Sequence, residues 1–325
     1  MHMPKVSVII PVFGVEKYIE RCARSLFEQT LDDIEYLFIN DCTEDASMDV
    51  LERVMQEYPQ RKNQIRIVNM PTNSGQAAVR RYGIHLATGN YIIHCDSDDW
   101  VDIKMYEIMY REAVSEDLDI VICDCFYSTE KSNIYKNCYS TLDKCKLLHD
   151  LITQKVPVAV WNKLIKKELY NNKELIYPTH NVGEDYALTI QLVLYAKKYG
   201  YIKNALYYYY QNPLSITKQQ SYSAIKKQYI DINDNMSIIT QVLKRKNLYD
   251  IYNRDLIERK KQYRDLILTK MENDRSFRLI YLNSFPELGL NNEKGLIHKF
   301  KYLLIYFNMY PLFIILRKIV KRKLM

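Results

Sequence analysis

Three carboxylates fall within four residues in the tetrapeptide Asp96-Ser97-Asp98-Asp99, called DSDD below, directly after the apolar run YIIHC (91–95). Hard divalent cations prefer carboxylate oxygens and complete their shell with water or phosphate oxygens. The cluster could therefore hold a cation, and a diphosphate would be a natural further ligand. The alternative is an acidic turn that caps a helix beginning near Asp102, because Asp and Ser are common at helix starts.

Asp41 directly follows another apolar run, IEYLFIN (34–40), and its carboxylate could accept a hydrogen bond from a nucleobase imide. Asp41 could instead belong to the turn that begins the next helix. Thr43 and Asp45 are better placed for that capping role. Both interpretations stay open at this point.

Arg80 and Arg81 follow the loop NSGQAAV (73–79), in which Gly75 permits a tight turn. Either guanidinium could bind a phosphate through two parallel hydrogen bonds. An exposed arginine on a helix needs no ligand, so neither residue indicates a phosphate site by itself.

Glu184 and Asp185 follow Gly183 at the start of an apolar helical stretch. A carboxylate there could take a proton from an incoming hydroxyl group. The alternative is an acidic first helical turn, which the helix dipole favours by roughly 0.3 to 1 kcal/mol per charge. Upstream, Trp161 and Asn162 could form the floor of a sugar site, although a tryptophan is as often part of the core.

Alternating strand and helix patterns position these residues. Strands are predicted at 6–11, 34–40, 65–69, 91–95 and 119–125, with helices at 16–27, 46–58, 76–87 and 104–115. Such alternation predicts an α/β fold with a Rossmann-like, mostly parallel sheet flanked by helices. Ligands of such sheets bind beyond the carboxyl ends of the strands, where three of the first four strands carry polar or acidic groups.

Composition narrows the class of protein. The chain has 325 residues, 48% of them hydrophobic, and 46 Lys and Arg against 39 Asp and Glu, a formal charge of +7. This charge favours acidic partners without choosing among them. The seven cysteines show no paired CxxC spacing, and no export signal is apparent at the N-terminus, so we expect a cytoplasmic protein.

A change of composition divides the chain. We predict one domain over residues 1–215, with a nucleotide-sugar half at about 1–125 and an acceptor half at about 126–215. Residues 216–325 are predicted to be helical, with long patterns rich in Lys, Arg, Tyr and Ile. The run YYYY (207–210) is predicted to be a late strand.

The helical region ends in a basic amphipathic segment, 298–325. Its uncharged run YLLIYFNMYPLFIIL (302–316) is shorter than the about 20 residues that span a bilayer, and Pro311 interrupts it. Apolar and aromatic residues beside clustered Lys and Arg are typical of segments that lie in anionic headgroups. A helix packed on the protein, or a short spanning segment, is the alternative.

The motifs together resemble one family. VSVIIPVFGVEKYI (6–19), INDCTED (39–45), NSGQAAVRRYGIHLATGNYI (73–92) and DSDD, in this order and spacing, resemble family 2 inverting glycosyltransferases with a GT-A fold, of the bacterial surface-polysaccharide type. A weaker match continues through VWNKLIKKEL (160–169) and NVGEDYAL (181–188). The resemblance covers about two-thirds of the chain and leaves the last hundred residues uncovered.

The resemblance implies roles for individual residues. Nucleotide-sugar binding would fall to Pro11, Val12, Phe13, Asp41, Arg80, Asp96, Ser97 and Asp98. Within this set Asp41 would accept from uracil, and Arg80 would face the diphosphate or the base. Asp98 and Asp99 resemble the positions that contact ribose and a divalent cation, Mn²⁺ or Mg²⁺. Asp185 would be the catalytic base, supported by Glu184, and Trp161 and Asn162 would meet the acceptor.

Two positions depart from the family pattern. Asn40 stands before Asp41 where relatives usually have a second acid, and Phe13-Gly14 replaces the usual Tyr-Asn. Both changes keep the fold and leave the nucleotide preference open.

The function implied is metal-assisted transfer of a sugar from a nucleotide-diphosphate donor, a UDP-sugar, to a glycan or a lipid-linked glycan, on the inner face of the cell membrane. One alternative is a non-catalytic nucleotide-sugar or carbohydrate-binding protein. A sugar-phosphate nucleotidyltransferase is another, although PVFGVEK (11–17) lacks its usual glycine-rich loop. No nucleic-acid partner is expected, because the basic residues of the tail lie beside apolar ones.

Overall fold

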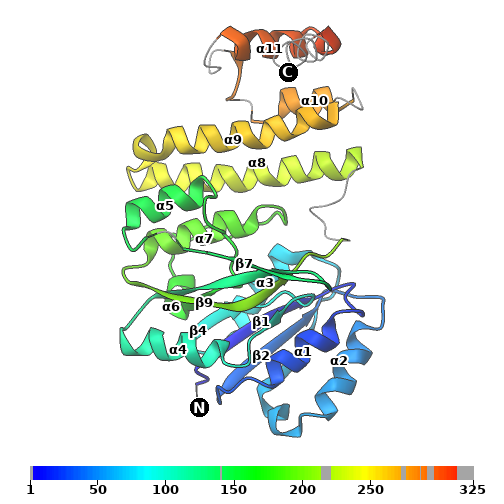
Figure 1. Cartoon of the computed structure of the whole chain (residues 1–325), viewed down its shortest axis with the longest axis vertical. Helices are drawn as coiled ribbons and strands as arrows, with labels where there is room; N and C mark the ends of the chain where they lie inside the picture. Colours follow the sequence, from blue (N-terminus) through cyan, green and yellow to red (C-terminus); the bar gives the residue numbers. More distant parts are fainter. Residues whose placement is uncertain are drawn as a thin grey trace. The chain divides into compact units, whose positions relative to one another are not determined.

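The structure is a computed structural model that describes residues 3–139, 141–213, 221–271, 276–285, 287–290 and 296–312. The chain divides into two compact units, Met1–Ser215 and Ile216–Met325. The first contains a sheet covered by helices and the second is built from helices (Figure 1).

Four of the five predicted strands are parallel neighbours in the sheet, namely β1 (Val6–Val12), β2 (Ile34–Asn40), β3 (Ile65–Asn69) and β4 (Tyr91–His94), and the fifth, 119–125, is confirmed as part of β6 (Ile120–Ser128). The four parallel strands lie in the order β3-β2-β1-β4. Val12 pairs with Asn40, and Asn40 with Asn69, so the three strands end at the same level. The loops that follow them therefore meet at one edge of the sheet, as predicted.

Helices cover both faces of these strands. Phe38 of β2 packs on Phe27 of α1 (Ile19–Phe27), with ring centroids 5.9 Å apart. The next residue, Ile39, faces Gly83 of α3 (Gln76–Leu86). Because successive strand residues point to opposite faces, α1 and α3 lie on opposite sides of the sheet. α2 (Ser47–Gln56) packs beside α1 (Figure 1).

The other half of the sheet is mixed, which strand-helix alternation did not predict. β6 (Ile120–Ser128) runs parallel to β9 (Tyr199–Tyr210), whereas β8 (Lys163–Lys166) is antiparallel to both β4 and β6. β9 also pairs antiparallel with β5 (Trp100–Val101). β9 contains the YYYY run, as predicted, and brings it against the residues that follow DSDD.

Four further helices belong to this unit, namely α4 (Met105–Ser115), α5 (Lys144–Ile152), α6 (Lys167–Tyr170) and α7 (Glu184–Tyr195), together with a 3₁₀ turn at Pro59–Gln64 and the edge strand β7 (Asn133–Lys136). Nearly all the residues of α7 are buried. A helix that is apolar on every side has to be buried, so α7 holds the acids at its start in a fixed place.

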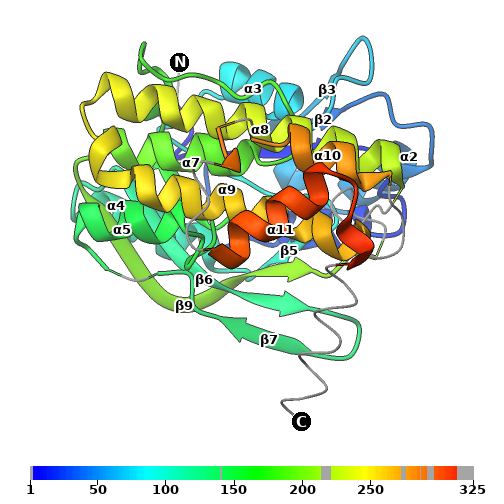
Figure 2. The same ribbon diagram turned by 90° about the horizontal axis from the view of Figure 1, so that it is seen from above.

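The second unit contains α8 (Tyr222–Arg245), α9 (Tyr249–Met271), α10 (Phe277–Asn283) and α11 (Leu296–Tyr306). Figure 2 shows α11 beside α9 and α10. The core of this unit is formed by Ile225, Tyr229, Ile267, Phe277, Ile280, Tyr281, Ile305 and Tyr310. No helix in the described part of the chain is long and apolar enough to span a bilayer. Residues 313–325, the end of the predicted amphipathic segment, lie outside the described residues.

Replacing Gly83 by Ala tests the packing of α3 on the sheet. A Cβ at this position would lie 2.5 Å from Ile9 Cγ2 and 2.8 Å from Ile39 Cδ1. Overpacking of this kind costs about 1 to 3 kcal/mol and outweighs the gain of up to about 1 kcal/mol in helix propensity. We expect a lower free energy of unfolding in urea. Gly289→Ala, whose Cβ meets nothing within 4 Å, is the matched control and should change little.

Candidate active site

Asp41 lies at the end of β2, where it holds the loop that leads into α3. Its two carboxylate oxygens accept hydrogen bonds from the backbone N–H groups of Ser74 (2.7 Å) and Gly75 (2.8 Å). Gly75 has a φ of +81°, and a Cβ there would meet the side chain of Asn181. Asp41 is buried, so any contact with a base would use the lone pairs that the loop leaves.

The loops after β1 and β2 are tied together. Backbone N–H groups of residues 14–16 donate to the side chains of Thr43 (2.8 Å), Ser47 (3.0 Å) and Asp45 (3.0 Å). Asp45 also accepts from the Ser47 N–H at 3.2 Å in the turn that leads into α2, although the N-cap position itself is Ala46. Beside this junction Val12 is buried and Phe13 is 53% exposed, so a ligand can reach the Phe13 ring and not the Val12 side chain.

The DSDD tetrapeptide forms a turn closed by a 3.0 Å bond from the Asp99 N–H to the Asp96 carbonyl. It does not cap the following helix, because β5 intervenes. Asp102 accepts from the Lys104 N–H at 2.8 Å in the turn before α4, and no side chain caps the start of that helix.

Asp99 is fully buried behind this turn. Its carboxylate accepts from the Tyr207 hydroxyl (2.6 Å) and from the Tyr210 N–H (2.7 Å), both on β9. Burial, with Asp98 and Asp96 close by, raises its pKa well above the usual range. These contacts do not support the predicted metal role of Asp99, because both oxygens face the protein interior. They indicate an anchor for β9.

Asp96 and Asp98 are the two acids of the turn that are only partly buried. The Asp98 carboxylate accepts from Asn212 (2.9 Å), and its backbone carbonyl accepts from Arg21 (3.0 Å). Burial and the charge of Asp96 raise the pKa of Asp98. A carboxylate in such surroundings gains from a cation that neutralises it.

Arg80 is the centre of the site. One of its terminal nitrogens, Nη1, donates to both Glu184 and Asp185, and the other, Nη2, donates to Asp96. The arginine is only 2% exposed. It therefore brings DSDD and the acids of α7, which are almost ninety residues apart in the sequence, to one place. These bonds argue against the predicted contact of Arg80 with a diphosphate, because Nη1 and Nη2 both already donate to carboxylates.

The charges in this cluster depend on one another. Burial would lower the pKa of Arg80, but Asp185, Asp96 and Glu184 outweigh this effect and keep it well above its usual value. Burial raises the pKa of Glu184 well above its usual range, against the opposing effect of Arg80. Asp185 is more exposed than Glu184, so Asp185 is the acid that a substrate can reach.

Residues that the sequence did not single out complete the arrangement. The Asn181 side chain accepts from the Ala77 N–H at 3.0 Å and so links the loop before α7 to α3. The Tyr207 hydroxyl accepts from the Asp96 N–H at 3.0 Å while it donates to Asp99. Both residues lie in runs quoted above, Asn181 in NVGEDYAL and Tyr207 in YYYY, but the sequence assigned neither a role at the site.

Trp161 and Asn162, predicted near the acceptor, are both buried. The Trp161 ring stacks on Tyr207 and Tyr209, with centroids 4.3 and 5.4 Å away. The Asn162 amide donates to the Cys123 carbonyl at 2.9 Å and accepts from buried Lys163. These contacts favour the structural alternative, in which Trp161 supports β9 from behind the site.

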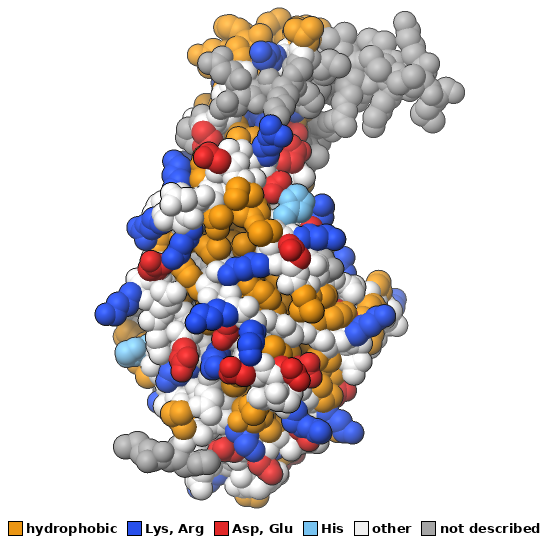
Figure 3. All heavy atoms as spheres, turned by 90° about the vertical axis from the view of Figure 1, so that its left-hand side faces the viewer, with side chains coloured by type: hydrophobic (Ala, Val, Ile, Leu, Met, Phe, Trp, Pro, Cys, Tyr) orange, Lys and Arg blue, Asp and Glu red, His pale blue; other side chains and the backbone are white. Residues whose placement is uncertain are grey.

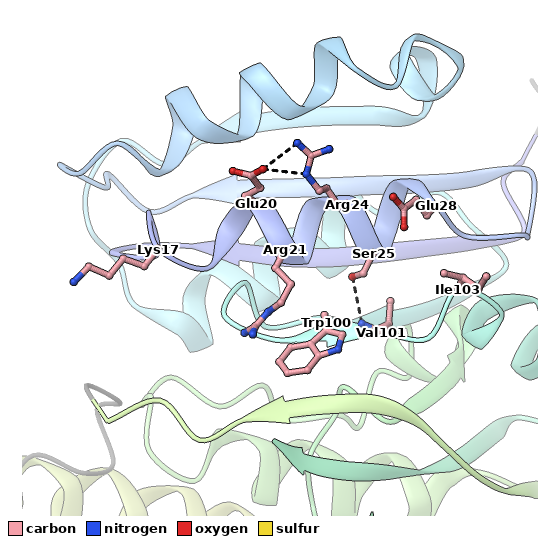
Figure 4. Close-up of a pocket in the computed structure, with 9 residues that line it drawn as sticks. All are labelled: Lys17, Glu20, Arg21, Arg24, Ser25, Glu28, Trp100, Val101 and Ile103. Carbon is pink, nitrogen blue, oxygen red and sulfur yellow. Dashed lines mark hydrogen bonds and ion pairs between the residues drawn. The ribbon is translucent and has the colours of Figure 1, made fainter. Parts of the chain in front are cut away.

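A separate cavity of about 640 Å³ lies between α1 and β5 (Figure 4). Its floor includes Trp100, whose ring lies between the Arg21 guanidinium, 3.7 Å from the ring centroid, and the ring of Tyr208. None of the predicted nucleotide-sugar residues lines this cavity. We therefore do not assign the donor to it.

Comparison with known proteins identifies the family. Residues 7–184 match the family described as Glycosyl transferase family 2, which is more than half of the chain. The chain belongs to this family. A candidate glycosyltransferase of Bacillus subtilis (strain 168), EpsH, is 32% identical over 219 residues, which is 64% of this chain and 61% of EpsH. The chain thus spans about three-fifths of that relative.

Solved structures confirm the predicted GT-A fold. S. aureus TarS 1–349 in complex with UDP-GlcNAc matches with a TM-score of 0.57 over 80% of each chain, at 15% identity. The mannosyltransferase PcManGT from Pyrobaculum calidifontis in complex with GDP-Man and Mn²⁺ matches with a TM-score of 0.54 at 12% identity, over 95% of this family 2 chain and 88% of PcManGT. Identities this low show the fold alone.

Replacing Arg80 by Met tests the ion cluster. The variant leaves three carboxylates close together in a buried place without their cation, a change that typically costs about 3 to 5 kcal/mol. We expect the free energy of unfolding in urea to fall by this amount. Arg81→Met is the matched control, because Arg81 is exposed and stacks only on Tyr177. It should cost about 1 kcal/mol or less. Equal losses in the two variants would contradict a central role for Arg80.

Proposed function

We propose that this chain transfers a sugar from a nucleotide-diphosphate donor, a UDP-sugar, to a hydroxyl group of a glycan or lipid-linked glycan, with inversion at the anomeric carbon. The observation that carries the proposal is the Arg80 cluster, which joins Asp96 of DSDD to Asp185. A donor bound against DSDD would then have its reacting carbon near a carboxylate that can take a proton. Membership of family 2 supports the same reaction.

The proposed step is a single displacement. The acceptor oxygen attacks the anomeric carbon, and its proton passes to the Asp185 carboxylate. The bond from the anomeric carbon to the diphosphate oxygen breaks, and its electron pair leaves with the nucleoside diphosphate. Glu184 and Arg80 hold Asp185 in position. Phe13 and the half-buried Pro11 would offer the surface against which the nucleotide lies, and the buried Val12, Asp41 and Ser97 would support that surface.

A divalent cation, Mn²⁺ or Mg²⁺, fits this arrangement. Such a cation would neutralise the charge of the leaving diphosphate as a Lewis acid. Among the described residues no group of three or more His, Cys, Asp or Glu forms a complete metal cage. One or two carboxylates with phosphate oxygens are enough for these cations. We propose Asp98 as the principal protein ligand, since Asp98 lies at the open side of the turn and Asp99 does not.

We also propose a cytoplasmic location on the inner face of the membrane. All seven cysteines are free, and the sulfurs of Cys125 and Cys138 lie 3.4 Å apart without a bond. Close thiols of this kind suit a reducing compartment.

Asp185→Asn tests the base. Removal of a general base costs about 10² to 10⁴ in rate, so kcat should fall by that factor while the Kd for the nucleotide changes little. The measurements are product formation from a labelled nucleotide sugar and calorimetric titration of the nucleotide. Asp117→Asn, at an exposed aspartate, is the control. Nucleotide binding without product in the unmodified chain would favour the non-catalytic alternative instead.

A pair of substitutions separates the two acids at the end of DSDD. Asp98→Asn should abolish metal-dependent transfer and leave the melting temperature nearly unchanged. Asp99→Asn should destabilise the protein by about 1 to 3 kcal/mol, because the bonds from Tyr207 and Tyr210 are weakened. Chelation of the cation should stop sugar transfer by the unmodified chain. Transfer that continues in the presence of a chelator would overturn the metal assignment.

A further inference from the structure

The last described helix, α11, is apolar on two sides. Leu304 and Ile305 are buried on the side that faces the core of the helical unit. On the same side Lys301 makes a 3.1 Å ion pair with Asp265 of α9. These contacts explain how α11 packs on its unit. They do not involve the apolar residues on the opposite side of the helix.

The other side forms what we call the α11 stripe. Its exposed residues are Leu296, Lys299, Phe300, Tyr306 and Phe307. The spacing from 296 is i, i+3, i+4, i+10 and i+11, so the residues share one face of the helix. Leu296 is 87% and Phe307 64% exposed, and the residues just beyond the helix, Met309 and Leu312, are also exposed. Figure 3 shows apolar side chains gathered at this end of the helical unit with a basic side chain among them.

The stripe belongs to a helix that is fixed in its unit. The Arg278 guanidinium on α10 donates to the carbonyls of Ile305 (2.7 Å) and Tyr306 at the end of α11, and the Asn308 N–H also donates to the Ile305 carbonyl (3.1 Å). The Tyr310 hydroxyl donates to the Leu268 carbonyl at 3.3 Å. The aromatic side chains are therefore presented to solvent by an anchored surface.

Charge indicates what covers the stripe. Residues 216–325 contain 22 Lys and Arg against 10 Asp and Glu, a formal charge of +12, which leaves −5 on residues 1–215. Five of the last nine residues, 317–325, are Lys or Arg; they lie outside the described residues and enter here only through their charge. The basic character of the chain is thus confined to the unit that carries the stripe.

We propose that the α11 stripe docks on an anionic lipid surface, with Phe300, Tyr306 and Phe307 in the headgroup and upper acyl region and Lys299 against anionic headgroups. A second copy of the chain fits less well, because it would bring two units of charge +12 together. The docking is independent of the proposed transfer reaction and can be tested without a sugar donor.

The test is sedimentation of the full chain with vesicles of phosphatidylcholine alone or mixed with phosphatidylglycerol, at low and high salt. We expect binding to the anionic vesicles at low salt, with clear loss at high salt and on neutral vesicles. Phe300→Ser with Phe307→Ser should weaken the partition coefficient at least about tenfold. The matched control is Ile251→Ser with Leu279→Ser, two exposed apolar residues of the same unit outside the stripe, which should bind within about twofold of the parent.

Three results would overturn the proposal. The first is no binding to anionic vesicles, and the second is equal binding by the stripe variant and the control variant. The third is light scattering that shows a dimer of the parent chain which the stripe substitutions dissociate, because a second copy would then be the occupant.

Discussion

The arrangement of the candidate site depends on one buried cation. Asp96, Glu184 and Asp185 would repel one another in a low-dielectric interior, and each would lose the water that stabilises its charge. The Arg80 guanidinium offsets both costs because its planar fork can donate to several carboxylates at once. The turn that would hold the donor and the helix that would supply the base are thereby joined through a single side chain of α3.

Around this cation, polar side chains hold the loops at the edge of the sheet. Asp41 binds the backbone of the loop before α3, Asn181 binds the start of that helix, and Asp99 binds β9. Asp41 and Asp99 resemble ligand-binding residues in sequence, yet both make structural hydrogen bonds in the fold. A rim held in this way keeps its shape before a substrate arrives, which lowers the cost of organising it on binding.

The two units of the chain carry different chemistry. The carboxylates of the candidate site lie in a unit of net charge −5, whereas the helical unit of charge +12 exposes the α11 stripe. An acidic site suits a cation and its phosphate ligand, and a basic surface with aromatic residues suits an anionic lipid. The overall charge of +7 does not reveal this division, because it is the sum of −5 on the first unit and +12 on the second.

The sequence by itself determined the first four parallel strands, the helices between them and the edge at which DSDD and Asp41 lie, because hydrophobic periodicity is a local property and the ends of parallel strands meet. It also identified the family through ordered motifs. The short strands β5, β7 and β8 were decided by their pairing in the fold. Only the tertiary structure decided which of the acids are buried in structural hydrogen bonds and which remain open to a ligand. Asp98 and Asp99 are adjacent and chemically identical, and they differ because Tyr207 and Tyr210, more than a hundred residues away, turn one of them inward. Likewise no local pattern indicates that Arg80 faces three carboxylates, since that contact exists only when α3, α7 and β4 pack together.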